Sequence, residues 1–112
     1  MSEESKLPEL ESQAKELEAK LGGIKGFVSD NPAYAGKVYV KINFPAGIVN
    51  KNSYVVVSIS EIAEPIRGYY PIWGGVLMSV YNVIPRDDNV VVVLVKIEGN
   101  NPVPFRITLH VL

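Results

Sequence analysis

Apolar side chains near the start of the chain recur at alternating spacings of three and four residues. That spacing is the a/d pattern of a heptad, so it predicts a short coiled-coil helix over residues 1–24, regular from residue 7. The seam residues, which we expect to form an oligomer interface, are Leu7, Leu10, Ala14, Leu17, Leu21 and Ile24. The alternative is a single amphipathic helix that lies on its own domain, although such a helix usually shows a wider apolar stripe. An isolated helix this short is marginally stable, so we expect the rest of the chain to contribute to association.

Residues 25–36 show no hydrophobic period. They contain the turn-forming residues Gly26, Asp30-Asn31-Pro32 and Gly36. Glycine, proline, asparagine and aspartate in this density are typical of a connection. We therefore expect a linker between the N-terminal helix and a second part of the chain.

From residue 37 onward the hydrophobic period becomes two, which is the period of a half-buried strand. Turn residues separate the apolar stretches, and no helical pattern lies between them. The predicted strands are Lys37–Phe44, Tyr54–Ser60, Val76–Ile84, Val90–Ile97 and Val103–Val111, with a short edge strand at Ile66–Tyr70. Strands joined by short turns favour an antiparallel β-sandwich of five to six strands over residues 37–112.

Two of these strands are apolar on both faces. Val90–Val95 has six consecutive apolar residues, and Val76–Val83 is nearly as two-sided. Because an antiparallel sandwich usually leaves one face of each strand in water, something must cover the second face. A copy of the same chain would do so; alternatively, each strand is central in its sheet and the N-terminal helix of its own chain overlies it. Together with the heptad, this pattern predicts a homo-oligomer, but the seam residues do not decide between a trimer and a dimer.

Charge and composition narrow the function classes. The chain has 112 residues and a formal net charge of −1, with no basic stripe, so nucleic-acid binding has no electrostatic support. Its apolar runs are far shorter than the roughly 20 residues of a membrane-spanning helix. The polar, acidic N-terminus does not resemble a signal peptide. We expect a soluble protein made in the cytoplasm, with no membrane insertion.

The residues that usually carry catalysis are sparse. There is no cysteine, and the single histidine, His110, lies on the predicted outer face of the last strand, where a plain surface role is its commonest one. Neither a base–nucleophile arrangement nor a zinc shell is available from this set. The adjacent Asp87 and Asp88 have no spaced series of further ligands around them and are typical of a solvated turn. We expect no enzyme activity, no cofactor and no metal site.

The best candidate for ligand contact is the long segment between the second and third strands. It places Arg67, Tyr69, Tyr70 and Trp73 within seven residues among prolines and glycines. These residue types dominate binding hot spots, and flat aromatic faces beside polar groups suit sugars. The alternative for Trp73 is a structural role, either in the core or at a subunit interface.

Two sequence motifs follow each other in this part of the chain. They are Lys41-Ile42-Asn43-Phe44-Pro45 and Asn52-Ser53-Tyr54-Val55-Val56-Val57-Ser58. Together they resemble the opening of C-terminal knob domains of bacteriophage tail fibres and of the related H-type lectin sandwiches. The resemblance covers residues 37–112 and implies a trimeric antiparallel β-sandwich behind a coiled-coil or fibrous stalk. The aromatic ending of that family is absent from Ile107–Leu112, so we carry over no binding residue.

These observations lead to one expected function and one alternative. We expect a non-enzymatic, oligomeric virion protein made in the host cytoplasm, either structural or receptor-binding, whose partner is a cell-surface glycan or protein. The alternative is a purely structural assembly protein, such as a capsid cement, turret or baseplate subunit.

Overall fold

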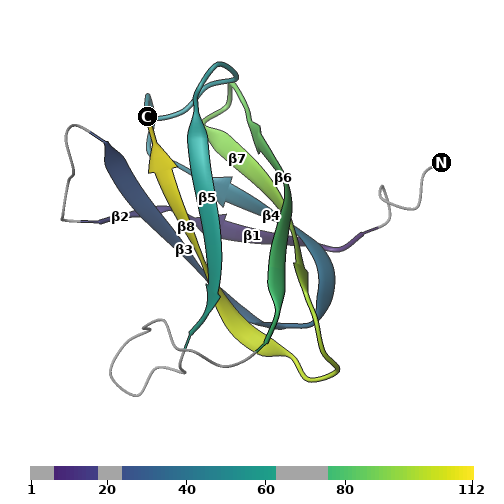
Figure 1. The fold of residues 1–112 in the computed structure, drawn as a ribbon. Coiled ribbons are helices and arrows are strands. Elements are labelled where there is room, and N and C mark those ends of the chain that lie inside the picture. Colours follow the sequence, from purple (N-terminus) through teal and green to yellow (C-terminus); the bar gives the residue numbers. More distant parts are fainter. Residues whose placement is uncertain (1–6, 18–23, 63–75) are drawn as a thin grey trace.

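The protein is a two-layered β-structure, described here from a computed structural model over residues 7–17, 24–62 and 76–112 (Figure 1). Its strands are β1 (Glu9–Gln13), β2 (Lys15–Glu16), β3 (Lys25–Tyr34), β4 (Gly36–Asn43), β5 (Val55–Glu61), β6 (Met78–Pro85), β7 (Val90–Ile97) and β8 (Val103–Val111). One sheet has the order β1-β4-β7-β6 and is called the β4–β7 sheet. The other has the order β2-β3-β8-β5 and is called the β3–β8 sheet. The prediction of a mainly β protein with two packed sheets is confirmed.

The core lies between the two sheets and follows the period-two pattern. Inward side chains alternate along β4, β7 and β8, and most of them have no solvent exposure. The fully buried set includes Phe27, Val38, Val40, Ile42, Val91, Val93, Val95, Ile97, Phe105, Ile107 and Leu109. Phe27 and Phe44 meet edge to face, with ring centroids 4.9 Å apart, which is a favoured aromatic geometry. Alternation therefore predicts the central strands well, because each has one face that must be buried.

The N-terminal segment corrects the predicted helix. Residues 7–17 contain the strands β1 and β2, so a helix is wrong for this part of the chain. β1 pairs in parallel with β4, where a purely antiparallel sandwich was expected. The physical reason is that residues 9–14 also alternate: Leu10 and Ala14 pack on the core, whereas Glu9, Glu11 and Gln13 are exposed. A short isolated helix is marginal, while the open edge of β4 supplies backbone partners at once.

The predicted seam residues therefore have different surroundings from those expected. Leu7, Leu17 and Ile24 are half-buried, and Leu10 and Ala14 contact the core of their own chain. Leu17 approaches Gly26 so closely that a Cβ on Gly26 would lie 3.1 Å from its Cδ1 atom. Leu21 lies outside the described residues.

Between β1 and β2 the chain passes from one sheet to the other. The Ala14 N–H donates to the Asn43 carbonyl of β4 at 2.8 Å, and three residues later the Leu17 N–H donates to the Gly26 carbonyl at 2.8 Å, next to β3. Figure 1 shows this β1–β2 segment running across the back of both sheets. The crossing ties the two sheets together along one side of the sandwich, which we call the crossed side.

The expected linker is a strand. Residues 25–34 form β3, which pairs along its length with β8, and the chain turns into β4 at Gly36, whose φ of +94° favours glycine. Turn-forming residues are tolerated here for particular reasons. Asp30 pairs with Arg106 of β8, and Pro32 lies at an irregularity of the register between Asn31 and Tyr34, where no ladder hydrogen bond is required.

The two-sided strand β7 is central in its sheet, between β4 and β6. Its inward residues fill the core, and its outward residues Val90 and Leu94 are also buried. No helix overlies β7 among the described residues, which also include no helix long and apolar enough to span a membrane. Side chains of β4 and β6 flank the outer face of β7, and that face holds the candidate site.

A candidate binding surface on the β4–β7 sheet

The outer face of the β4–β7 sheet carries a shallow depression of about 330 Å³. Its lining residues are Lys37 and Tyr39 of β4, Tyr81 and Asn82 of β6, and Leu94 of β7. Leu94 is only 8% exposed, whereas Tyr81 is 53% exposed. An apolar side chain is thus flanked by two aromatic rings, an amide and a cation.

A β-bulge in β6 places two side chains beside Leu94. The register of β6 against β7 shifts between Val80, which faces Val95, and Asn82, which faces Leu94. Tyr81 is the additional residue, and both Tyr81 and Asn82 are exposed. A regular strand would send these two neighbours to opposite faces, so the bulge brings both to the rim of the depression.

The opposite wall comes from β4, where the alternation is regular. Tyr39 faces Leu94 directly across the β4–β7 ladder, and Lys37 lies two residues earlier on the same face. The Lys37 Nζ atom lies 5.4 Å from the centroid of the Tyr81 ring, a cation–π contact that spans the depression. Such a contact at an exposed position contributes roughly 0.5–1 kcal/mol and holds both side chains in place.

The chemistry of this depression suits a flat ligand with polar edges. Aromatic faces offer large contact area with few rotatable bonds, and Lys37 supplies hydrogen-bond donors at the rim. The Asn82 carboxamide oxygen accepts from the N–H of Val83 at 3.1 Å. Asn82 is exposed, and its NH₂ group has no hydrogen-bond acceptor among the described residues. Nothing in this set activates a nucleophile, so the arrangement favours binding.

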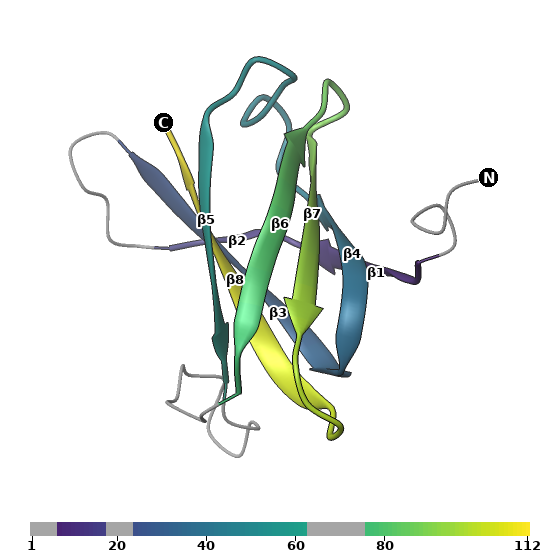
Figure 2. The same cartoon turned by 45° about the vertical axis from the view of Figure 1, so that its right-hand side comes forward.

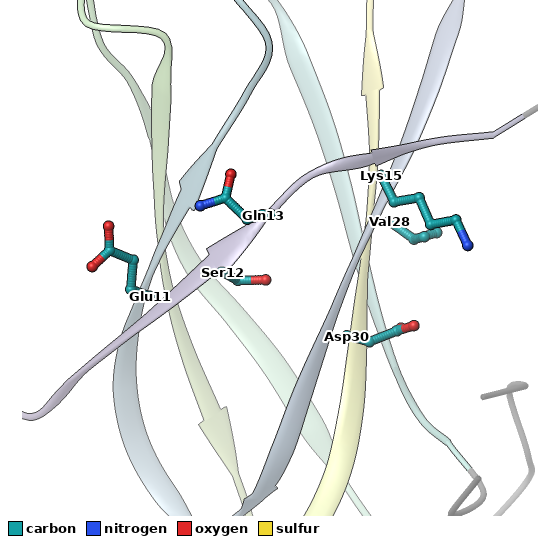
Figure 3. A pocket seen from close by; sticks show the side chains of 6 residues that line it. All are labelled: Glu11, Ser12, Gln13, Lys15, Val28 and Asp30. Atoms are coloured by element: carbon teal, nitrogen blue, oxygen red, sulfur yellow. The ribbon is translucent and has the colours of Figure 1, made fainter. Parts of the chain in front are cut away.

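A second pocket of about 410 Å³ lies where the chain leaves the β4–β7 sheet (Figure 3). Its lining residues are Glu11, Ser12, Gln13, Lys15, Val28 and Asp30. Ser12 points from β1 toward β3, whereas Glu11 and Asp30 point in opposite directions (Figure 3). The two carboxylates therefore do not converge on a common point, as a paired acid–base site would require.

Three of the polar side chains that line this pocket already form hydrogen bonds within the protein. Glu11 accepts a hydrogen bond from the Asn43 amide at 3.0 Å, and Ser12 accepts one from the Ser29 hydroxyl at 2.7 Å. Asp30 accepts two from the Arg106 guanidinium, at 2.6 and 3.1 Å. We interpret the pocket as the notch left by the crossing strand.

The Asp30–Arg106 pair joins β3 to β8 on the outer face of its sheet. Both side chains are largely buried, and the contact is bidentate. Hydrogen bonding to Asp30 raises the pKa of Arg106 above its ordinary value, against the opposing effect of burial. Arginine is charged at every physiological pH, and we interpret the pair as a structural contact between the two strands.

The remaining chemical candidates do not assemble into a site. Among the described residues, no three histidine, aspartate or glutamate side chains gather closely enough to hold a metal ion. His110 is exposed on β8. The Asp87–Asp88 turn is held by an ion pair from Arg86 to Asp88 and by the Lys51 N–H, which donates to Asp87 at 3.0 Å.

The predicted ligand-contact residues Arg67, Tyr69, Tyr70 and Trp73 lie outside the described residues. The sequence analysis did not select the residues around the depression. A strict period of two across residues 78–84 places Tyr81 and Asn82 on opposite faces of the strand. Both residues are exposed only because β6 contains a bulge. A bulge has no sequence signature strong enough to predict its position.

Comparison of the chain with protein-family models, with curated proteins and with solved structures finds no match. A functional proposal for this chain therefore rests on its residues and their geometry.

Proposed function

We propose that this protein is a non-enzymatic binding head of a virion, and that its depression on the β4–β7 sheet receives a ring of a cell-surface glycan. One observation carries the ligand part of the proposal: Tyr39, Tyr81 and Lys37 surround a buried leucine on an otherwise open sheet face. The virion part rests on the resemblance of residues 37–112 to tail-fibre knob sandwiches.

The geometry supports a saccharide because of how the polar and apolar groups are arranged. The apolar C–H face of a sugar ring packs on tyrosine, while its hydroxyl groups take hydrogen bonds from lysine and asparagine. Such an open site makes few contacts, so binding of a single ring is weak, and useful affinity needs several copies of the head acting together.

The test is ligand-observed NMR on the full chain with methyl galactoside, methyl mannoside and N-acetylglucosamine as probes. We expect saturation transfer to at least one probe, and its loss in Tyr81→Ala and in Lys37→Ala. Tyr54→Ala is the matched control, because Tyr54 is 77% exposed and lies beside the other sheet. Transfer that persists in Tyr81→Ala but disappears when Tyr69, Tyr70 and Trp73 are replaced by alanine would move the site to that segment.

The alternative proposal is a purely structural assembly protein, such as a capsid cement, turret or baseplate subunit. One observation favours it: Val56, Leu77 and Ile84 expose apolar surface along β5 and β6. Under this alternative none of the three probes binds, and substitutions along β5 and β6 prevent incorporation into particles. Co-sedimentation of the protein with purified particles distinguishes a virion component from a protein of another setting.

We still propose a homo-oligomer, but not one held together by an N-terminal coiled coil. The predicted seam lies partly within the sandwich, where Leu10 and Ala14 pack on their own core. We propose that association uses another surface of the sandwich.

A further inference from the structure

The side of the sandwich opposite the crossed side ends in two edge strands, β5 and β6, one from each sheet. We call it the open side. β5 and β6 run side by side in both views, and no strand among the described residues joins them by hydrogen bonds (Figure 2). Edge strands carry backbone groups without partners, which makes them templates for a further strand.

The hydrogen-bonding pattern shows which backbone groups of β5 have no partner strand among residues 7–17, 24–62 and 76–112. At one end of the β5–β8 ladder the Leu112 N–H donates to the Tyr54 carbonyl at 3.0 Å, and at the other the Ile62 N–H donates to the Pro104 carbonyl at 3.1 Å. Antiparallel ladders alternate, so the even-numbered residues between them bond to β8. The N–H and C=O groups of Val55, Val57 and Ile59 consequently point away from β8, toward the open side.

β5 also lacks the features that usually protect an edge strand. Residues 54–60 contain no charged residue, proline or glycine, and their register against β8 is unbroken. The other edges differ: β6 has a bulge at Tyr81 and ends in Pro85, β1 exposes Glu9 and Glu11, and β2 has only two residues. A bulge, a proline or a charge each opposes strand addition.

The side chains of β5 indicate that a partner strand would add burial on both faces. Val55, Val57 and Ile59 face the core but are only half-buried. On the outer face, Tyr54 and Val56 are 77% and 55% exposed. A strand added beside β5 would cover part of each set.

We propose that β5 is an interface for a second copy of this chain, whose own β5 pairs with it antiparallel about a twofold axis at Val57 or Ser58. A twofold contact brings the same residues together, and residues 54–60, which carry no charge, oppose no like charges when they meet their copy; Glu61 at the end of β5 lies away from the axis. The two β3–β8 sheets then form one continuous sheet across the axis. This inference rests on the homo-oligomer in the proposed function and names its surface.

Analytical ultracentrifugation of the full chain between about 1 and 100 µM tests the pairing. We expect a monomer–dimer equilibrium. Val57→Pro removes an N–H that faces the open side, and it leaves the hydrogen bonds between β5 and β8 intact. We therefore expect it to weaken dimerisation at least tenfold. Val83→Pro is the control on the edge of β6: the Arg86 N–H donates to the Val90 carbonyl, so the same alternation directs the Val83 N–H away from β7, and it donates only to the Asn82 side chain of its own strand among the described residues.

Amide hydrogen exchange of the unmodified chain gives a second measurement that needs no variant. The Val55, Val57 and Ile59 amides should be protected at high concentration and exchange rapidly on dilution, whereas the amides bonded to β8 should stay protected at both. Concentration-independent exchange, a trimer, or a dimer weakened by Val83→Pro and not by Val57→Pro would overturn the pairing. A monomer that gains this protection only when another protein is added would overturn it too. A monomer that still binds a saccharide probe through Tyr81 would overturn the pairing while supporting the binding head.

Discussion

The crossed side and the open side of this sandwich differ in how the edges of the two sheets are covered. On the crossed side, β1 and β2 pass from one sheet to the other, and buried side-chain hydrogen bonds accompany the crossing. On the open side, β5 and β6 end the two sheets without a strand between them. The difference shows that an edge can be satisfied within one chain by a crossing segment or left available to another molecule. The crossed side should therefore determine stability, and the open side association.

The largest effect should follow from a charge placed under the crossing strand. Leu10 packs on the core from β1, so Leu10→Asp buries a carboxylate against apolar side chains. We expect the free energy of unfolding to fall by about 3 kcal/mol or more. Urea denaturation followed by circular dichroism measures it. Gln13→Asp on the exposed face of the same strand is the control, and an equal loss there would contradict the inward placement of Leu10.

A smaller loss should follow from Ser29→Ala at the buried hydrogen bonds of the crossed side. The Ser29 hydroxyl donates to Ser12, and the Asn31 amide donates to the carbonyl and hydroxyl oxygens of Ser29 at 3.0 and 3.1 Å. Ser29 and Asn31 are both buried, so removing the hydroxyl leaves polar atoms with fewer partners and should cost about 1–2 kcal/mol. Ser58→Ala on exposed β5 should change the unfolding free energy by less than about 0.5 kcal/mol.

The ion pair next to the crossing should contribute about 1 kcal/mol. Asp30→Asn weakens the bidentate contact with Arg106. The Arg106 side chain is 17% exposed, and the Asp30 side chain is 25% exposed. The loss should be nearly the same at low and at high salt, because a largely buried pair is poorly screened. Asp88→Asn provides the contrast, since the Arg86–Asp88 pair is exposed. A strong salt dependence for Asp30→Asn would show that its pair is more solvated than the structure indicates.

The smallest effect on stability should come from the open side. Val56→Thr replaces an exposed apolar side chain with a residue that also favours strands. The unfolding free energy at a concentration where the chain is monomeric should change by less than about 0.5 kcal/mol. A loss comparable to that of Ser29→Ala would mean that the open side supports the monomer fold, and the contrast between the two sides would no longer hold.

The sequence predicts a segment of this fold well where its hydrophobic pattern is compatible with only one kind of secondary structure. Along β4 and β8 the period of two is unbroken and admits one interpretation. Residues 7–17 satisfy both a heptad and an alternation, and the available edge of β4 decides between them. In β3 the local preferences of Asp30 and Pro32 oppose a strand, and pairing with β8 overrides them.

The candidate site was harder to predict than the fold, since it depends on neighbours in space. Tyr39 and Tyr81 are 42 positions apart in the numbering, and both come to line one depression because β7 lies between their strands. No local spacing records that arrangement. The bulge that exposes Tyr81 beside Asn82 is likewise a property of the paired strands.

The position of β8 has a consequence for how the chain acquires its fold during synthesis. β8 lies between β3 and β5, yet it is made after all the other strands that the structure describes. Until it emerges, β3 and β5 have no common neighbour, and one whole layer of the sandwich cannot assemble. Pairs as distant as Lys25 and Val111 must then find each other, which is typical of slow-folding proteins. A nascent chain halted after β7 should therefore stay sensitive to proteases, and protection should appear only once β8 has been made.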